Sequence, residues 1–101
     1  MVAAVAHENR PKPLLSCPLK VTFGFTMPRP KSHYGTGKKA GTLKPNAPFY
    51  HTSAPDTTKL IRSTEDAMKK IIWVDDSQIA DQNAVKLYGD IPGCHVTIEQ
   101  L

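Results

Sequence analysis

Apolar residues recur with two different spacings along this chain, and the change of spacing divides it into elements. Around residues 14–27 apolar side chains occupy every second position, as they do in a half-buried β-strand. These positions include Leu19, Val21, Phe23 and Phe25. A less regular alternation covers 78–88, and a clear one begins at residue 94, after a turn at 90–93. The pattern predicts a C-terminal β-hairpin.

Residues 57–71 show the other spacing, in which apolar side chains recur every three or four positions and share one face of an α-helix. The apolar face comprises Leu60, Ile61, Thr64, Ala67, Met68, Ile71 and Ile72. Asp56 or Thr58 can accept hydrogen bonds from the unpaired amides of the first turn, which marks the helix start. Together these elements predict an α+β fold of two layers, in which one main helix covers a mixed β-sheet in the order strand, long loop, helix and hairpin.

Residues 28–54, between the first strand and the helix, are rich in Pro and Gly and show no sustained periodicity. We therefore expect a long flexible loop. Its basic residues are interleaved with Tyr34, Phe49 and Tyr50, a composition typical of elements that follow a nucleic-acid backbone and stack on bases. The alternative is a solvated loop whose charges have no specific role. A short edge strand over 47–51 is expected to lead towards the helix.

Charge is unevenly distributed over the 101 residues, which we expect to form one domain. Residues 1–50 carry eight Lys or Arg and one acidic residue, and residues 51–101 carry five Lys or Arg and eight Asp or Glu. The basic half favours nucleic acid or an anionic surface as partner. The two cysteines lack the spacing of a zinc site and are expected to be reduced and half-buried. The apolar start, MVAAVA, is too short for a signal peptide or membrane span, which indicates a cytoplasmic protein without membrane contact.

Two adjacent carboxylates, Asp75 and Asp76, fall on the connection that follows the helix. Adjacent like charges are tolerated by solvation in a surface turn, or by a cation that both help to neutralise. Asp is also a common turn residue. Asp56 has the same two interpretations, as a helix cap or as a metal ligand, and the residues alone leave both open.

The string PDTTKLIRSTEDAMKK, followed by WVDDSQI, resembles the signature of the RusA-type Holliday junction resolvases, small phage and prophage endonucleases. In that family a D-x-D-N-L-x-K helix start precedes a D-A helix body and a W-x-D-D-x-Q-V turn. The resemblance covers roughly residues 14–101. It implies a homodimer that cleaves branched DNA with Mg²⁺, or with Mn²⁺ in its place, in recombination and repair in the bacterial host cytoplasm, without a small-molecule cofactor. Family chains open with a further strand and helix, so residues 1–13 are expected to be a shortened N-terminal segment, with 1–8 as the remnant of that helix.

Matched position by position, the resemblance implies the catalytic residues Asp56, Asp76 and Arg62. It implies a metal site formed by Asp56, Asp76, Asp75 and Thr58. Thr58 stands where the family has a second aspartate, and Arg62 stands where it has lysine. An alternative is therefore a weakened or inactive branched-DNA-binding protein on the same scaffold. Nucleic-acid contacts are expected from Arg29, Lys31, Lys38, Lys39, Lys44 and Lys59.

Overall fold

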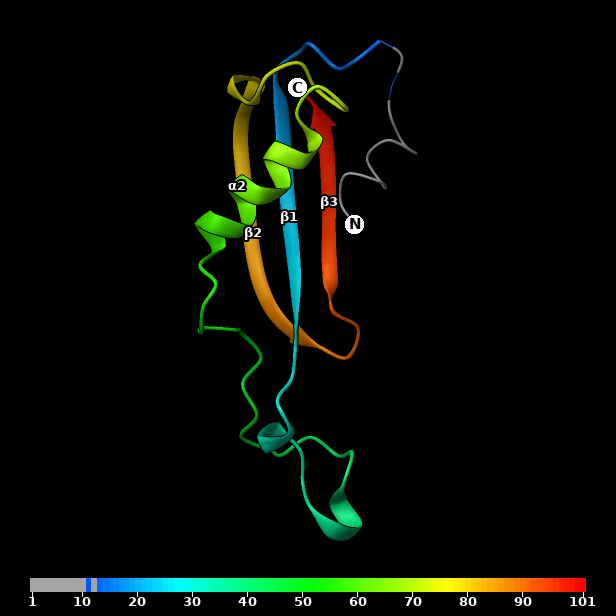
Figure 1. The fold of residues 1–101 in the computed structure, drawn as a ribbon, viewed down its shortest axis with the longest axis vertical. Helices are drawn as coiled ribbons and strands as arrows, with labels where there is room; N and C mark the ends of the chain where they lie inside the picture. Colours follow the sequence, from blue (N-terminus) through cyan, green and yellow to red (C-terminus); the bar gives the residue numbers. More distant parts are fainter. Residues whose placement is uncertain (1–10, 12) are drawn as a thin grey trace.

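A computed structural model describes Pro11 and residues 13–101 (Figure 1), so the helix remnant expected over 1–8 lies outside the described residues. The described part contains a three-stranded sheet in the order β2-β1-β3. Its strands are β1 (Leu19–Pro28), β2 (Ile79–Gly89) and β3 (Gly93–Gln100). β1 is parallel to β2 and antiparallel to β3, and helix α2 (Thr57–Met68) covers one face of this sheet. The predicted α+β fold, a mixed sheet with one main helix, is confirmed.

The two C-terminal strands follow one another closely, but the pairing differs from the expected hairpin. β1 lies between β2 and β3, and each of them pairs with β1. The outer strands of a three-stranded sheet lie two spacings of ~4.8 Å apart. The short connection 90–92 can bridge this distance at ~3.3 Å per residue. β1 is central, and its inward side chains are the most completely buried of the sheet.

The core lies between α2 and one face of β1. The alternation predicted for β1 is confirmed, since its fully or almost fully buried residues are Leu19, Val21, Phe23 and Phe25. From the other layer, Met68, Ile72 and Trp73 complete the core. The helix ends at Met68, three residues before the predicted end at 71, and Lys70 then adopts a left-handed φ of 63°. This turn sends Ile72 and Trp73 back into the core instead of along the helix.

The strand register places the side chains of β2 on two distinct faces. Gln82 is opposite Val21 and Lys86 is opposite Phe25, so both share the core side of the sheet with α2. Asp81 is opposite Lys20 and belongs to the other face. The helix-facing positions of β2 are therefore available to a site beside α2.

Residues 29–54, which we call the arm, extend away from the sheet along the long axis of a molecule that measures 55 × 24 × 20 Å (Figure 1). The arm contains two short 3₁₀ turns, η1 (Lys31–His33) and η2 (Gly37–Lys39). It folds back on itself where the amide of Lys44 donates to the carbonyl of His33, at 2.9 Å. The returning chain pairs with β2 through a single antiparallel bridge between Tyr50 and Leu87. This bridge lies within the edge strand expected over 47–51, but the pairing does not extend into a strand.

Two smaller expectations can be compared with the fold. Both cysteines are free; Cys17 is half-buried as expected, whereas Cys94 is exposed because it stands at the start of an outer strand. Among the helices of the described residues, none is long and apolar enough to cross a membrane.

Candidate functional site

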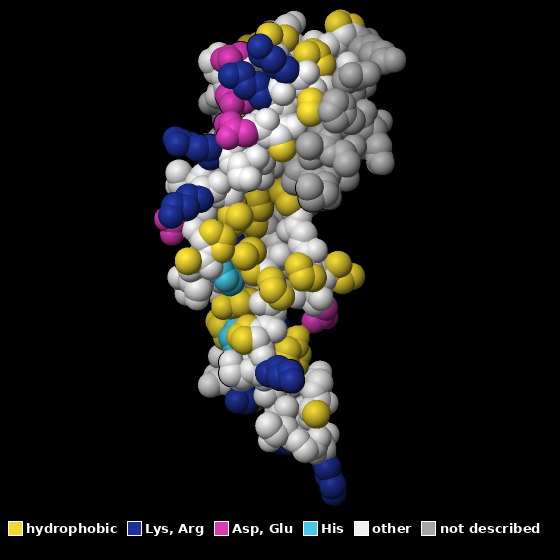
Figure 2. Space-filling model, in the orientation of Figure 1, with side chains coloured by type: hydrophobic (Ala, Val, Ile, Leu, Met, Phe, Trp, Pro, Cys, Tyr) yellow, Lys and Arg dark blue, Asp and Glu magenta, His cyan; other side chains and the backbone are white. Residues whose placement is uncertain are grey.

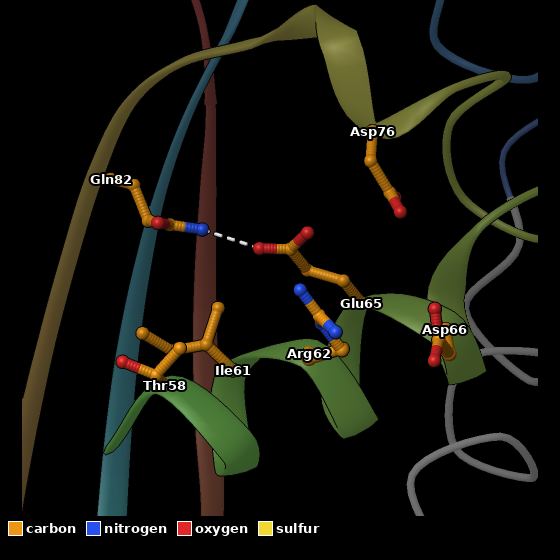
Figure 3. A pocket seen from close by; sticks show the side chains of 7 residues that line it. All are labelled: Thr58, Ile61, Arg62, Glu65, Asp66, Asp76 and Gln82. Atoms are coloured by element: carbon orange, nitrogen blue, oxygen red, sulfur yellow. Dashed lines mark hydrogen bonds between the residues drawn. The ribbon is translucent and has the colours of Figure 1, made fainter. Parts of the chain in front are cut away.

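An open cleft of about 390 Å³ lies between α2 and the beginning of β2 (Figure 3). It is lined by Thr58, Ile61, Arg62, Glu65, Asp66, Asp76 and Gln82. Positions 58, 61, 62 and 65 are three, four and seven residues apart, so they share one face of the helix. One helix face, one turn and one strand therefore meet around a predominantly polar hollow.

Asp76 reaches the cleft from the turn that follows α2. Trp73 is fully buried, and its indole Nε1 donates a hydrogen bond to Asp76 Oδ1 at 2.7 Å. Asp76 also begins the 3₁₀ turn η3 (Asp76–Gln78), whose N-cap is Asp75. The Asp75 carboxylate accepts a hydrogen bond from the amide of Ser77 at 3.0 Å. In the W-x-D-D sequence, the first aspartate thus closes the turn and the second points into the cleft.

Gln78 fixes this turn to the chain before β1. Its Oε1 accepts hydrogen bonds from the amides of Val74 and Asp75, at 2.9 and 2.8 Å. Its Nε2 donates to the carbonyls of Leu15 and Cys17, both at 3.0 Å. The two N–H groups and the two oxygen lone pairs of the Gln78 carboxamide are therefore all used in hydrogen bonds. Gln78 therefore connects two distant segments and holds the acidic turn in place.

Glu65 is the cleft residue that sequence reasoning did not single out. Its carboxylate points towards Asp76 across the cleft and accepts a hydrogen bond from Gln82 (Figure 3). Burial raises the pKa of Glu65, and the nearby negative charge of Asp76 raises it further. These effects outweigh the hydrogen bond from Gln82, which lowers the pKa. Glu65 is three residues from Arg62 and seven from Thr58, and this spacing in the sequence could have placed it on the same helix face.

The structure brings some of the predicted site residues together and separates others. The cleft contains Thr58, Arg62 and Asp76. Asp56 is exposed at the N-cap position of α2 and makes no side-chain capping bond. Asp75 is occupied by its cap and by an ion pair with Lys69, in which Nζ and Oδ1 are 3.2 Å apart. Hydrogen bonds from Ser77 and the ammonium of Lys69 lower the pKa of Asp75 to about 2. Neither Asp56 nor Asp75 lines the cleft.

A buried lysine holds the start of α2. Lys86 of β2 is only 9% exposed, and its ammonium donates to the carbonyls of Ser53 and Pro55, each at 2.6 Å. Pro55 directly precedes Asp56. Lys86 therefore fixes where the helix begins, and with it the position of Thr58 in the cleft.

The predicted nucleic-acid contacts divide into an exposed group and one half-buried residue, Arg29. Exposed and outside the ion pairs found in the described residues are Lys31, Lys38, Lys39, Lys44 and Lys59. Arg29 instead donates to the carbonyl of Pro48 at 2.7 Å, and its guanidinium lies 5.3 Å from the ring centroid of Tyr88. Figure 2 shows Lys and Arg side chains distributed from the helix region to the tip of the arm. The basic surface is therefore long, and Arg29 serves to anchor the arm.

The donor set of the cleft suits a hard divalent cation. Glu65, Asp66 and Asp76 offer carboxylate oxygens. Within the described residues, no three His, Cys, Asp or Glu side chains are arranged as a complete metal cage. Mg²⁺ usually keeps several waters and takes one or two carboxylates together with substrate phosphates. Glu65 and Asp76 both line the cleft and offer two such carboxylates.

The fold and cleft define a small α+β protein with an acidic site at a helix–turn junction and a basic arm. The family model for endodeoxyribonuclease RusA matches residues 1–99, and the chain belongs to this family. The chain is 30% identical over 105 residues to the uncharacterized protein YqaN of Bacillus subtilis (strain 168), an alignment that covers 99% of this chain and 70% of YqaN. No solved structure matches the chain. The family predicted from the helix and turn motifs is confirmed.

Proposed function

We propose that this protein is a Mg²⁺-dependent endonuclease that hydrolyses phosphodiester bonds in branched DNA such as four-way junctions. The observation that carries the proposal is the placement of Asp76 and Arg62 in one cleft of a chain that belongs to the RusA family. A bound divalent cation supplies charge neutralisation and an activated water at the phosphate. Asp76 and Glu65 are the residues that would hold it.

The protein's own groups contribute positioning and positive charge. The buried indole of Trp73 keeps the Asp76 carboxylate oriented into the cleft. Arg62 presents a planar guanidinium suited to phosphate oxygens, and it stabilises negative charge that develops during cleavage. Lys59 is exposed on the same helix and adds to the attraction of the DNA backbone.

The experiment is nicking of a synthetic four-way junction by the purified chain in Mg²⁺. Asp76→Asn removes one charge in the cleft, and Asp81→Asn removes the same charge on the opposite face of the sheet. We expect cleavage by the wild type and by Asp81→Asn, and loss of cleavage in Asp76→Asn. A wild-type chain that cuts no branched DNA in Mg²⁺ or Mn²⁺ overturns the proposal.

The proposed active form is a homodimer, because a four-way junction requires two symmetric cuts. The Cα radius of gyration is 16.7 Å, whereas a compact chain of ~100 residues has ~13 Å. Large apolar side chains are also exposed, with Phe49 at 59%, Tyr50 at 60% and Ile91 at 85%. Figure 2 shows hydrophobic side chains gathered near the middle of the molecule, where the arm meets the sheet. Sedimentation should give a dimer, and a monomer that still cuts would refute this part of the proposal.

Mixing two inactive chains shows whether each site is complete within one subunit, as we propose. Asp56 precedes the cleft residue Glu65 by nine residues, which is ~13 Å along a helix axis at ~1.5 Å per residue. This distance raises the question of whether Asp56 acts in the cleft of its own chain or in that of its partner. If each cleft works within its own chain, a mixture of Asp56→Asn and Asp76→Asn stays inactive, provided that both variants are inactive alone. Recovered nicking in the mixture would show that Asp56 acts across the dimer axis.

A second candidate function, binding of branched DNA without cleavage, is favoured by one observation. Thr58 lies in the cleft and carries no charge where the family motif has aspartate. Junction binding without nicking in Mg²⁺ or Mn²⁺ would support this alternative. Thr58→Asp restores a hard anionic ligand, and we expect it to raise cation affinity or cleavage. Unchanged activity and unchanged metal dependence would show that position 58 is not a ligand position in this chain.

A further inference from the structure

We propose that Phe49 and Tyr50 form a stacking platform for bases that have lost a stacking neighbour at the branch point of the DNA. The assignment rests on the proposed function, because it names the part of the branched DNA that this segment holds. The Lys and Arg contacts expected on the arm bind phosphates, which are present in branched and linear DNA alike. A surface that binds exposed base faces would distinguish a branch point from an ordinary duplex.

The two aromatic side chains are exposed, although the backbone that carries them is fixed. Phe49 is 59% and Tyr50 is 60% exposed, and their rings lie edge to face with the centroids 5.1 Å apart. The amide of Tyr88 donates to the carbonyl of Phe49 at 3.0 Å. The amide of His51 donates to the carbonyl of Lys86 at 3.0 Å, so β2 holds the chain on both sides of Tyr50. A segment that is already fixed loses little conformational freedom when a ligand binds.

Side chains on both flanks strengthen this attachment. Before the aromatic pair, Arg29 donates to the carbonyl of Pro48 at 2.7 Å. After it, the His51 ring lies against Tyr88, with the centroids 4.9 Å apart. The His33 ring and the Arg29 guanidinium also pack on Tyr88, at 4.7 and 5.3 Å from its ring centroid. The base of the arm therefore holds the segment in place and leaves the rings of Phe49 and Tyr50 in solvent.

Charge favours DNA over a second copy of the chain as the ligand of these rings. Residues 28–54 carry five Lys or Arg and no Asp or Glu, and Figure 2 shows basic side chains on either side of the hydrophobic ones. Two such segments would repel one another at a shared interface, whereas a phosphate backbone is attracted to both. Aromatic rings among basic side chains bind single-stranded DNA widely, because every base offers a face for stacking. The assignment leaves Ile91, on the connection between β2 and β3, for the contact between subunits.

The platform lies within reach of a DNA strand that enters the cleft. Tyr50 bridges to Leu87, five residues along β2 from the cleft residue Gln82. This separation is ~17 Å at ~3.3 Å per residue. Duplex DNA rises ~3.4 Å per base pair, so a base about five pairs from a phosphate in the cleft can reach the rings. The platform would therefore place the cut close to the branch point.

DNA binding without divalent cations tests the assignment separately from cleavage. The probes are a synthetic four-way junction and a linear duplex with the same ends. Phe49→Leu and Tyr50→Leu keep an apolar side chain but remove the ring, and we expect each to weaken junction binding by ~5-fold or more. Phe49→Trp should retain the affinity that Phe49→Leu loses, because it keeps a ring.

The linear duplex and a control variant make the test specific. The leucine variants should bind the linear duplex as the wild type does, because each base inside a duplex is already stacked on its neighbours. Their salt slope on the junction should also be unchanged, since no phosphate contact is lost. Leu43→Ala, at another exposed apolar position of the arm, should bind both DNAs as the wild type does.

Wild-type junction affinity in both leucine variants would overturn the platform and leave the proposed nuclease intact. An equal loss of affinity for junction and duplex would overturn it as well. Sedimentation of the leucine variants as monomers, beside a dimeric wild type, would assign the rings to the subunit contact instead. A wild type that neither prefers the junction to the duplex nor cuts it would overturn both the platform and the proposed function.

A second measurement uses the unaltered protein. Iodouracil in DNA forms photochemical cross-links with aromatic side chains that stack on it. Placed at the branch point, it should cross-link to Phe49 or Tyr50, as mapped by mass spectrometry of the digested chain. Placed in the middle of a linear duplex, it should not. Cross-links from the branch point to other residues only, or to none, would refute the platform.

Discussion

Gln78 provides a quantitative test of how the acidic turn is held, because its carboxamide makes four hydrogen bonds. Replacement by Leu removes all four. A neutral hydrogen bond contributes ~0.5–1.5 kcal/mol, and the lower part of that range applies because the turn is partly exposed and the freed groups regain water. We expect Gln78→Leu to lose ~2–3 kcal/mol in the free energy of unfolding, and the midpoint of thermal unfolding to fall by ~10–20 °C for a domain of ~100 residues.

Urea unfolding followed by tryptophan fluorescence measures this loss. Gln78→Glu keeps the shape and the two accepted bonds, but it loses both donated bonds and places a carboxylate against the carbonyls of Leu15 and Cys17. It should therefore be destabilised by a similar amount. Asn83→Ala, on the exposed face of β2, is the control and should stay within ~0.5 kcal/mol of the wild type. A Gln78→Leu chain as stable as this control would refute the structural role described here.

Three further predictions concern charge. Neutralising Lys38, Lys39 and Lys44 together should weaken binding to every DNA structure alike and reduce the salt slope by ~1 for each phosphate that these lysines neutralise in the wild type; an unchanged slope would mean that the arm is only solvated. The pKa of Asp75 is lowered to about 2, so its ionised form stabilises the fold above pH ~4, and this contribution is lost as the pH falls towards 2. Asp75→Asn should be less stable than the wild type at pH 7, and this difference in stability should shrink as the pH falls from ~4 towards 2. A difference that stays constant would contradict a stabilising role of the ionised Asp75 carboxylate. The pKa of Glu65 is raised, so its ionised form destabilises the fold above that pKa. Without divalent cations, Glu65→Gln should be at least as stable as the wild type in urea at pH 7. A clear loss of stability there would contradict burial and the charge of Asp76 as the causes of the raised pKa.

The local elements could be predicted from the sequence because their signals are local. The alternation from Leu19 to Phe25 identified the inward face of β1, and the helical spacing identified α2 to within three residues at its end. The sheet order could not be predicted in the same way, since alternation defines the faces of a strand but not its neighbours. β3 pairs with β1, not with β2, and this choice of partner is a property of the assembled sheet.

The site shows the same division between local and assembled properties. The motif indicated Asp76 and Arg62, and the structure places both in the cleft. Glu65 escaped notice because a glutamate on a helix is usually a solvated residue, and only the return of the chain through Trp73 brings Asp76 against it. Gln78 appeared in the motif without a visible reason. Its function depends on Leu15 and Cys17, more than sixty residues earlier in the chain.

The hydrogen bond between Trp73 and Asp76 gives the protein an internal optical reporter. Trp73 is the sole tryptophan of the sequence, it is completely shielded from solvent, and its indole N–H contacts the carboxylate proposed to receive the ion. A change in the charge or partners of Asp76 therefore alters the electric field at the fluorophore. Emission from the unlabelled protein can follow the occupancy of the cleft in real time, without a substrate and without a dye.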